Sequence, residues 1–275
     1  MKVIAVANKK GGSGKTTSAV NLAAALARTG NHVLLADLDT QAHTTIGLGI
    51  NPRKLDNTIH HLLAVASAEG IEDCVRITAF ERLSLLPANQ DFDVTKIPHK
   101  LSAITVLRDG LKRLSGQFDV VVVDSPPSLD LPMYNTVLAA NFLLIPFQPG
   151  FLNFEGVGQM LRVLFKAALQ HRHKLELLGV LPVMLNPVAR MHRQILKQAL
   201  EQFGKDRVFA PIRRDIKLEE AFMHGMPGVQ YAPHSVGSHG YVRLAQVVAT
   251  KVAIRGQKTE DSRQNAVPVA SSAAS

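Results

Sequence analysis

A glycine-rich segment near the start of the chain carries the residue types best suited to bind a phosphate. It reads Asn-Lys-Lys-Gly-Gly-Ser-Gly-Lys-Thr-Thr over residues 8–17. Glycines let backbone N–H groups converge on an anion, and a following helix would add partial positive charge. Lys15 can reach the β- and γ-phosphates of a nucleotide, and the Thr16 hydroxyl can ligate Mg²⁺. The predicted nucleotide-binding residues are Gly11, Gly12, Ser13, Gly14, Lys15, Thr16 and Thr17.

Carboxylates follow two apolar runs further along the chain. Residues 32–36 predict a strand that leads into Asp37 and Asp39, and residues 118–123 predict a buried parallel strand that leads into Asp124. The carboxyl ends of strands in an open α/β sheet face the crevice where nucleotides bind. Either of the first two carboxylates could orient water or hold Mg²⁺ indirectly, and Asp124 is placed to hold Mg²⁺ through water.

The arrangement of lysines in residues 9–17 departs from the usual G-x-x-x-x-G-K-[ST] loop, because Lys9 stands where the first glycine belongs. The form Lys-Gly-Gly-x-Gly-Lys-Thr-Thr resembles the deviant Walker A motif of the ParA/MinD family of ATPases. In that family the lysine that matches Lys10 reaches across a dimer interface to the nucleotide of the partner subunit. The resemblance therefore implies an ATP-state homodimer with Lys10 and Lys15 as catalytic residues.

Two more segments carry the same resemblance. Residues 37–41, Asp-Leu-Asp-Thr-Gln, resemble the family's first switch, D-x-D-P-Q, with Thr40 in place of the proline. The second aspartate of that motif, here Asp39, is the family's catalytic carboxylate and positions the attacking water. Residues 124–127, Asp-Ser-Pro-Pro, resemble the second switch. The motifs together imply ATP and Mg²⁺ as cofactors. The implied metal ligands are Thr16 and, through water, Asp124.

In the second half of the chain the resemblance covers two properties, recognition of the adenine base and binding to DNA. Asn186 is the last residue of a predicted strand, and an asparagine in this place hydrogen-bonds adenine in related ATPases. Residues 212–221 resemble the family motif I-P-R-N-V-R-L-S-E-A, whose basic residues contribute to DNA binding. Val188 and Arg213 replace an arginine and a proline of the family pattern. The resemblance thus implies that Asn186 contacts the base. The implied DNA contacts are Arg213, Arg214 and Lys217.

Positioning these residues requires a scaffold of alternating strands and helices. The predicted strands are residues 2–7, 32–36, 83–88, 118–123, 142–150 with its exit, and 177–186. The predicted helices follow residue 17 and cover about 57–68, 100–114, 159–170, 190–202 and 240–254. This alternation predicts one ParA-like α/β domain over residues 1–254, with a doubly wound, mainly parallel sheet and a P-loop NTPase fold. Residues 255–275 are expected to form a disordered polar tail.

Composition narrows the class of protein. Hydrophobic residues make up 46% of the 275 residues and charged residues 19%, which is typical of a globular α/β protein. The single cysteine, Cys74, excludes an internal disulfide and a Cys-x-x-Cys metal or cluster site within one chain. His60 and His61 point in different directions on a helix, so we expect no metal site there. Without a recognisable signal peptide or membrane span, we expect a cytoplasmic protein.

Positive charge is concentrated in one part of the chain. The formal net charge is +9, and residues 159–217 hold twelve Lys and Arg against four Asp and Glu, a net charge of +8. Such concentration is what a phosphate-backbone footprint requires, and no base-reading motif accompanies it. The sequence therefore predicts binding to non-specific DNA, with strong salt dependence and a nucleoid-associated location.

The leading interpretation is a ParA/Soj-like partition ATPase, with a ParB-like partner that stimulates slow hydrolysis. One alternative is a ParA-like ATPase that positions a protein cargo, such as a chemoreceptor array or a microcompartment, which the sequence does not separate from the first. Another is a MinD-like membrane-associated ATPase. The tail after Gly256 has no aromatic residue, leucine or isoleucine, so it lacks the amphipathic helix that membrane binding needs.

Overall fold

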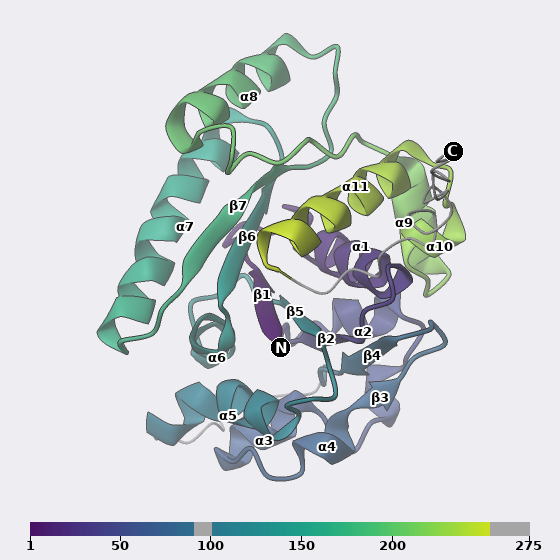
Figure 1. Ribbon diagram of the computed structural model, residues 1–275, viewed down its shortest axis with the longest axis vertical. Helices are drawn as coiled ribbons and strands as arrows, with labels where there is room; N and C mark the ends of the chain where they lie inside the picture. Colours follow the sequence, from purple (N-terminus) through teal and green to yellow (C-terminus); the bar gives the residue numbers. More distant parts are fainter. Residues whose placement is uncertain (91–100, 254–275) are drawn as a thin grey trace, which may run out of the picture.

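The computed structural model describes residues 1–90 and 101–253, and its centre is a twisted seven-stranded sheet (Figure 1). The spatial order of the strands is β3-β4-β2-β5-β1-β6-β7. β3 pairs antiparallel with β4, and all other neighbouring pairs are parallel. The strands are β1 (Lys2–Val6), β2 (Val33–Asp37), β3 (Arg76–Ile77), β4 (Leu83–Leu86), β5 (Val120–Asp124), β6 (Phe142–Phe147) and β7 (Glu176–Pro182). The predicted doubly wound, mainly parallel fold is confirmed.

Helices cover both faces of this sheet (Figure 1). One face carries α1 (Lys15–Arg28), α2 (His43–Gly47), α9 (Ile216–Met223), α10 (Gly228–Tyr231) and α11 (Val236–Lys251). The other carries α3 (Ile59–Val65), α4 (Ile71–Cys74), α5 (Val106–Arg113), α6 (Leu131–Ala139), α7 (Phe151–Gln170) and α8 (Arg190–Phe203). Two short 3₁₀ helices, η1 (Pro52–Lys54) and η3 (Leu101–Thr105), lie in the connections.

The valine run of β5 shows why the sheet is buried on both sides. Val121 and Val123 belong to the core beneath α3, α5, α6 and α7, whereas Val120 and Val122 belong to the core beneath α1 and α11. All four side chains are fully buried. Because successive side chains of a strand point to opposite faces, a continuous apolar run fits only a strand covered by helices on both faces.

Several helices differ from the predictions. α7 begins at Phe151, well before the predicted start at residue 159. Gly156 and Gly158 weaken the helical signal there, but Phe154 and Val157 are buried and hold the first turns in place. α6, which has Pro132 in its first turn, was not predicted. α2 and α4 were not predicted either, because helices of four or five residues carry too little periodicity.

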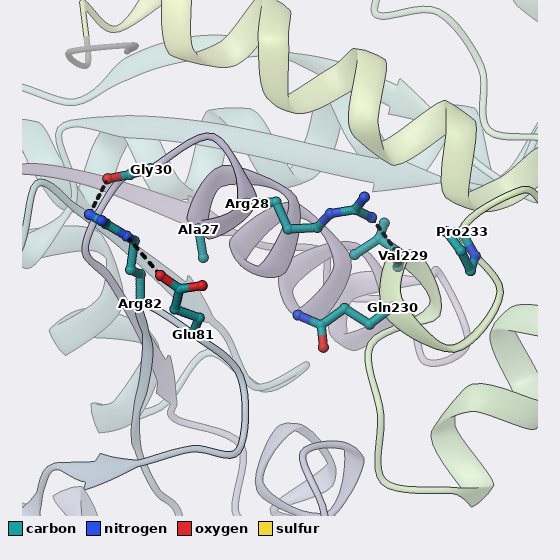
Figure 2. Close-up of a pocket in the computed structure, with 8 residues that line it drawn as sticks. All are labelled: Ala27, Arg28, Gly30, Glu81, Arg82, Val229, Gln230 and Pro233. Carbon is teal, nitrogen blue, oxygen red and sulfur yellow. Dashed lines mark hydrogen bonds and ion pairs between the residues drawn. The ribbon is translucent and has the colours of Figure 1, made fainter.

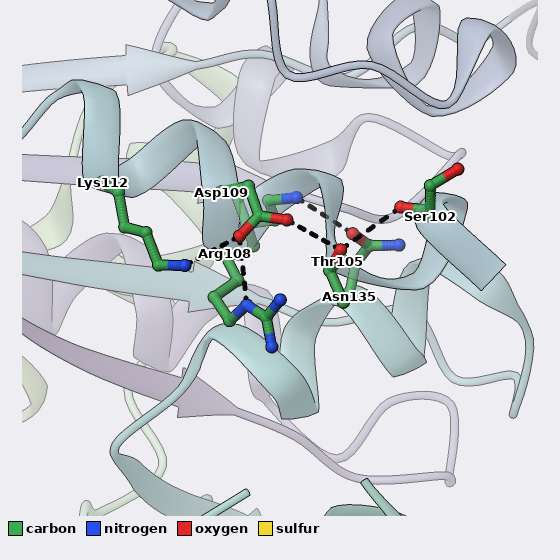
Figure 3. A network of polar contacts seen from close by, with 7 residues as sticks. Ser102, Thr105, Arg108, Asp109, Lys112 and Asn135 are labelled. Carbon is green, nitrogen blue, oxygen red and sulfur yellow. Dashed lines mark hydrogen bonds and ion pairs between the residues drawn. The ribbon is translucent and has the colours of Figure 1, made fainter.

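A polar network fastens α5 to α6 (Figure 3). Asn135 accepts a hydrogen bond from the Leu107 N–H at 3.0 Å and donates one to the Ala103 carbonyl at 2.7 Å. On the outer side of α5, the Asp109 carboxylate receives hydrogen bonds from Thr105, Arg108 and Lys112. The network supports the helical layer on that face. The predicted tail, residues 255–275, lies outside the described residues.

Candidate active site

The predicted phosphate-binding segment joins β1 to α1 at the carboxyl edge of the sheet. Gly12 and Gly14 have φ of +68° and +80°, a conformation that side chains with a Cβ rarely adopt. A Cβ on Gly14 would also lie 3.0 Å from Val183 Cγ2, so the strand β7 exit packs directly on the loop. Gly14 offers no side-chain cap to α1. The first N–H groups of the helix therefore remain available to an anion.

Lys15 lies buried beside the carboxylates of the site. Its Nζ donates to the Lys10 carbonyl at 3.4 Å, and only 7% of the residue is exposed. Burial lowers the pKa of the Lys15 ammonium, and the charges of Asp124 and Asp39 act in the opposite direction. A desolvated ammonium group at the start of α1 suits a polyphosphate, because a bound anion would add counter-charge beside it.

Asp124, at the end of β5, receives two hydroxyl groups on one carboxylate oxygen. Thr16 Oγ1 donates to Asp124 Oδ2 at 2.8 Å, and Thr44 Oγ1 donates to the same oxygen at 2.7 Å. The other oxygen, Oδ1, is buried and has no hydrogen-bond partner among the described residues. Burial raises the pKa of this carboxyl to about 6. An orphaned carboxylate oxygen beside a threonine hydroxyl fits a hydrated Mg²⁺, which would be held by Thr16 and Asp124.

The first switch is fastened through Asp37, which lies at the end of β2. Asp37 Oδ1 accepts the Asp39 N–H at 3.2 Å, and Oδ2 accepts the Thr45 N–H and hydroxyl, each at 2.8 Å. Burial raises the pKa of Asp37 well above its usual range, and the charge of Asp124 adds to this. Asp39 itself is buried, with 8% of the residue exposed, and accepts the Gln41 N–H at 3.0 Å. The carboxylate of Asp39 thus borders the same crevice as Lys15.

Thr44 and Thr45 are functional residues that the sequence analysis missed. Both are fully buried on α2, and their hydroxyls bond the two strand-end aspartates, Asp124 and Asp37. A pair of threonines just after the first switch was the available signal. The role of these threonines could not be predicted from the sequence, because it depends on α2, a helix too short to predict. α2 directs both hydroxyls toward the ends of neighbouring strands.

Lys10 is exposed at the rim of the loop, and its ammonium group contacts Asn153 Oδ1 at the start of α7. The Lys10 backbone N–H is held by Asn8 Oδ1 at 3.0 Å. In the isolated chain the side chain of Lys10 therefore lies across the carboxyl edge of its own sheet. Its predicted contact with a second subunit stays a prediction.

A pocket of about 210 Å³ opens beside Gly14 and Thr17. Its walls come from the exit of β7, the segment before α9, α9 itself and α11. Arg213 and Arg214 line it, so these two predicted DNA contacts border the nucleotide loop. Asn186 is exposed, and its Oδ1 accepts the Val188 N–H at 3.2 Å. Asn186 is not among the described residues that line this pocket, and its predicted contact with adenine stays a prediction. The pocket is lined by Gly14, Thr17, Val183, Met184, Ile212, Arg213, Arg214, Asp215, Leu218, Glu219, Phe222 and Tyr241.

The basic residues of segment 159–217 all lie on the surface. Arg190, Arg193 and Lys197 follow one another at helical spacing on α8, and we call these three the α8 basic stripe. The Arg214 N–H donates to the Leu185 carbonyl at 3.0 Å, which holds the arginine segment against the exit of β7, five residues before α8 begins. Lys217 forms an ion pair with Glu220 at 2.6 Å, and Lys197 of the stripe forms a longer one with Glu201 at 3.8 Å.

A larger cavity of about 500 Å³ lies at the other end of α1 (Figure 2). Its arginines are already engaged: Arg28 donates to the Val229 carbonyl, and Arg82 donates to the Gly30 carbonyl at 3.0 Å. Arg82 also pairs with Glu81 at 3.5 Å. This cavity is remote from the aspartates and the phosphate-binding loop, and we assign it no part in the chemistry.

The fold and this site define a P-loop nucleotide hydrolase whose loop carries an additional lysine. Residues 1–177 match the family model AAA_31, described as an AAA domain. The chain is 37% identical to the chromosome-partitioning ATPase Soj of Thermus thermophilus over 249 residues, which cover 90% of this chain and 96% of that protein. The chain belongs to the ParA/Soj group of the ParA/MinD family, and it is an ATPase.

Two solved structures share the architecture. Cobyrinic acid a,c-diamide synthase from Mycobacterium smegmatis, with bound ADP and magnesium, aligns with a TM-score of 0.76 and 31% identity, covering 93% of this chain and 97% of that chain. The septum site-determining protein MinD from Pyrococcus horikoshii, complexed with Mg-ADP, aligns with a TM-score of 0.76 and 25% identity, covering 93% and 99%. None of the helices in residues 1–90 and 101–253 is long and apolar enough to cross a membrane.

Proposed function

We propose that this chain is a DNA-partition ATPase that takes ATP with Mg²⁺, dimerises in the ATP state and binds non-specific DNA. The observation that carries the proposal is the convergence of Lys15, Asp39 and Asp124 around a glycine-rich loop, with Lys10 exposed at its rim. In this proposal hydrolysis dissolves the dimer and releases the DNA, and a ParB-like protein accelerates hydrolysis. The cargo is a plasmid or chromosome, and the protein is located on the nucleoid.

The chain's own residues suffice for the chemistry of the proposal. Backbone N–H groups of the loop and the Lys15 ammonium hold the phosphates and stabilise the charge that develops on them. Asp39 accepts a hydrogen bond from the attacking water and orients it in line with the scissile bond. Mg²⁺, held by Thr16 and Asp124, supplies neutralising charge when bound.

Lys10 provides the first test. We expect its ammonium group to leave Asn153 and reach the nucleotide of the partner subunit when the dimer forms. Lys10→Ala should therefore bind ATP yet remain monomeric in light scattering with ATP–Mg²⁺. Lys9→Ala is the matched control, since Lys9 is the neighbouring exposed lysine with the same charge. A Lys10→Ala protein that dimerises and hydrolyses like wild type would contradict the cross-subunit role.

For DNA, we propose that the α8 basic stripe and Arg213–Arg214 form one footprint on phosphates. Two such surfaces joined in a dimer would bind one duplex with high effective concentration. Each phosphate contact contributes about 0.9 to the slope of log K against log salt concentration, so removing the three charges of the stripe should lower the slope by about 3 per subunit.

The decisive measurement is binding to a non-specific duplex without nucleotide, with ADP and with ATP–Mg²⁺, each across a salt series. Tight, salt-sensitive binding with ATP–Mg²⁺ alone is the expected result. The stripe variant Arg190→Ala/Arg193→Ala/Lys197→Ala should lose it. The matched control removes equal charge from α5, through Arg108→Ala, Lys112→Ala and Arg113→Ala. Equal DNA binding in all three nucleotide states would mean that DNA binding does not depend on the ATPase cycle. The absence of DNA binding in every state would favour a function in which the protein positions a protein cargo or binds a membrane.

A further inference from the structure

His60, in the first turn of α3, is fully buried beneath the switch that carries Asp39. Its Nε2 lies 3.3 Å from the Leu38 carbonyl oxygen, and its Nδ1 lies 3.0 Å from the Asn89 backbone nitrogen and 3.3 Å from the Asn89 carbonyl oxygen. A backbone N–H only donates, so Nδ1 accepts the shorter of its two contacts, the one from the Asn89 N–H. Nε2 then carries the proton and donates it to the Leu38 carbonyl. Burial lowers the pKa of His60 to about 4, which keeps the ring neutral in this tautomer near neutral pH.

The Leu38–Asp39 peptide is held at both of its polar ends. His60 bonds its carbonyl, while its N–H donates to Asp37 Oδ1 at 3.2 Å. One residue earlier, the Leu38 N–H donates to the Asp124 carbonyl at 3.0 Å. Since a peptide unit is planar, two bonds at opposite ends fix the orientation of that plane. The direction in which the Asp39 side chain leaves the backbone is thereby determined.

The same imidazole ties the switch to the segment that leaves β4. The Ile59 N–H donates to the Pro87 carbonyl at 3.1 Å, and the Ala88 N–H donates to Thr45 Oγ1 at 3.1 Å. The next N–H, that of Asn89, bonds His60. Consecutive amides of one segment therefore reach α2 and α3, and His60 is the residue that connects this segment to the backbone before Asp39.

We propose that His60 is a positioning residue for hydrolysis, which fixes the Leu38–Asp39 peptide and so aims the Asp39 carboxylate at the attacking water. The inference rests on the proposed role of Asp39. It concerns a residue whose described hydrogen bonds go to the backbone of Leu38 and Asn89. A displaced carboxylate would impair the chemical step, whereas nucleotide binding depends on the phosphate loop, which His60 does not contact through those bonds.

Two substitutions separate the bonds of His60. In His60→Gln the terminal amide reaches the former position of Nε2 and still donates to Leu38. In His60→Asn the shorter amide reaches the position of Nδ1, so it accepts from Asn89 but leaves Leu38 without its donor. We expect His60→Asn to lower kcat about 10- to 100-fold with little change in KM, because small misplacements of a catalytic group cost this much. His60→Gln should retain kcat within a few-fold.

Controls distinguish this inference from the proposed function. His61→Asn changes the neighbouring exposed histidine and should leave kcat unchanged. Asp39→Ala, assayed beside it, tests the role of Asp39: normal hydrolysis by that variant refutes the proposed function itself. If Asp39→Ala is inactive while both His60 variants keep kcat, or while both lose it equally, the positioning role is overturned.

The wild-type protein offers a measurement that does not depend on folded variants. Long-range ¹H–¹⁵N NMR spectra of the histidine rings report which nitrogen bears the proton. A neutral His60 with the proton on Nε2 in the wild-type protein is the expected result. A proton on Nδ1 would mean that Leu38 receives no hydrogen bond, and would overturn the proposal.

Discussion

Replacing Asp124 by asparagine should stabilise the nucleotide-free protein while abolishing Mg²⁺-dependent hydrolysis. Asp124 is fully buried at the end of a central strand, and burial raises the pKa of its carboxyl from 3.8 to about 6. Hydrogen bonds from Thr44 and Thr16 and the charge of Lys15 oppose this effect without cancelling it. At neutral pH the fold therefore holds an ionised carboxylate in a place that disfavours its charge, and a bound cation would offset that cost.

The sign and size of the change in unfolding free energy follow from proton linkage. The folded-state pKa lies above the unfolded one, so the contribution of Asp124 to the unfolding free energy is full below pH 3.8 and is lost as the pH rises through about 6. This difference corresponds to about 3 kcal/mol. Asparagine does not ionise, so the variant should match wild type below about pH 4 and exceed its stability by up to about 3 kcal/mol above about pH 7. Lys15 loses a counter-charge in the variant, which reduces this gain.

Urea unfolding, followed by circular dichroism from about pH 4 to pH 8 without Mg²⁺ or nucleotide, measures the effect. Asp73→Asn, an exposed aspartate on α4, controls for the loss of one negative charge. A stability difference that does not change with pH would refute the reasoning. So would an Asp124→Asn protein that is less stable than wild type at neutral pH, because the two threonine bonds would then outweigh the cost of the buried charge.

Three further predictions follow from contacts of the site. Gly47→Ala should lower the unfolding free energy by about 1–3 kcal/mol in urea titrations, because its Cβ would lie 2.9 Å from Phe222 Cε2 and α2 would be pushed from α9; Phe222→Leu in the same chain should restore part of the loss. Gly14→Ala should weaken ATP binding in calorimetry more than tenfold, since positive φ costs a side chain about 1–2 kcal/mol and Val183 crowds the new Cβ. Arg213→Ala should raise the dissociation constant for ATP–Mg²⁺, because it removes a positive charge from the pocket beside Gly14, and an unchanged constant would mean that this pocket takes no part in nucleotide binding.

Local patterns in the sequence determined much of this protein. The alternation of apolar runs and helical periodicities predicted the doubly wound sheet, because each run reports its own burial. The glycines and lysines of residues 8–17 identified the nucleotide loop, since the required backbone conformation and charge are local properties. Asp39 and Asp124 were placed at the carboxyl edge by the rule that parallel strands end together.

Tertiary structure alone decided how those residues are held. Thr44 and Asp124 are 80 positions apart in the chain, yet one hydrogen bond joins them because β2 and β5 are neighbours in the sheet. His60 likewise reaches Leu38 only after α3 has packed beneath the switch. The pairing of strands and the packing of short helices depend on the free energy of the whole core, which no single segment encodes. The sequence therefore indicates which residues take part in the chemistry, and the packed sheet determines which other side chains hold them in position.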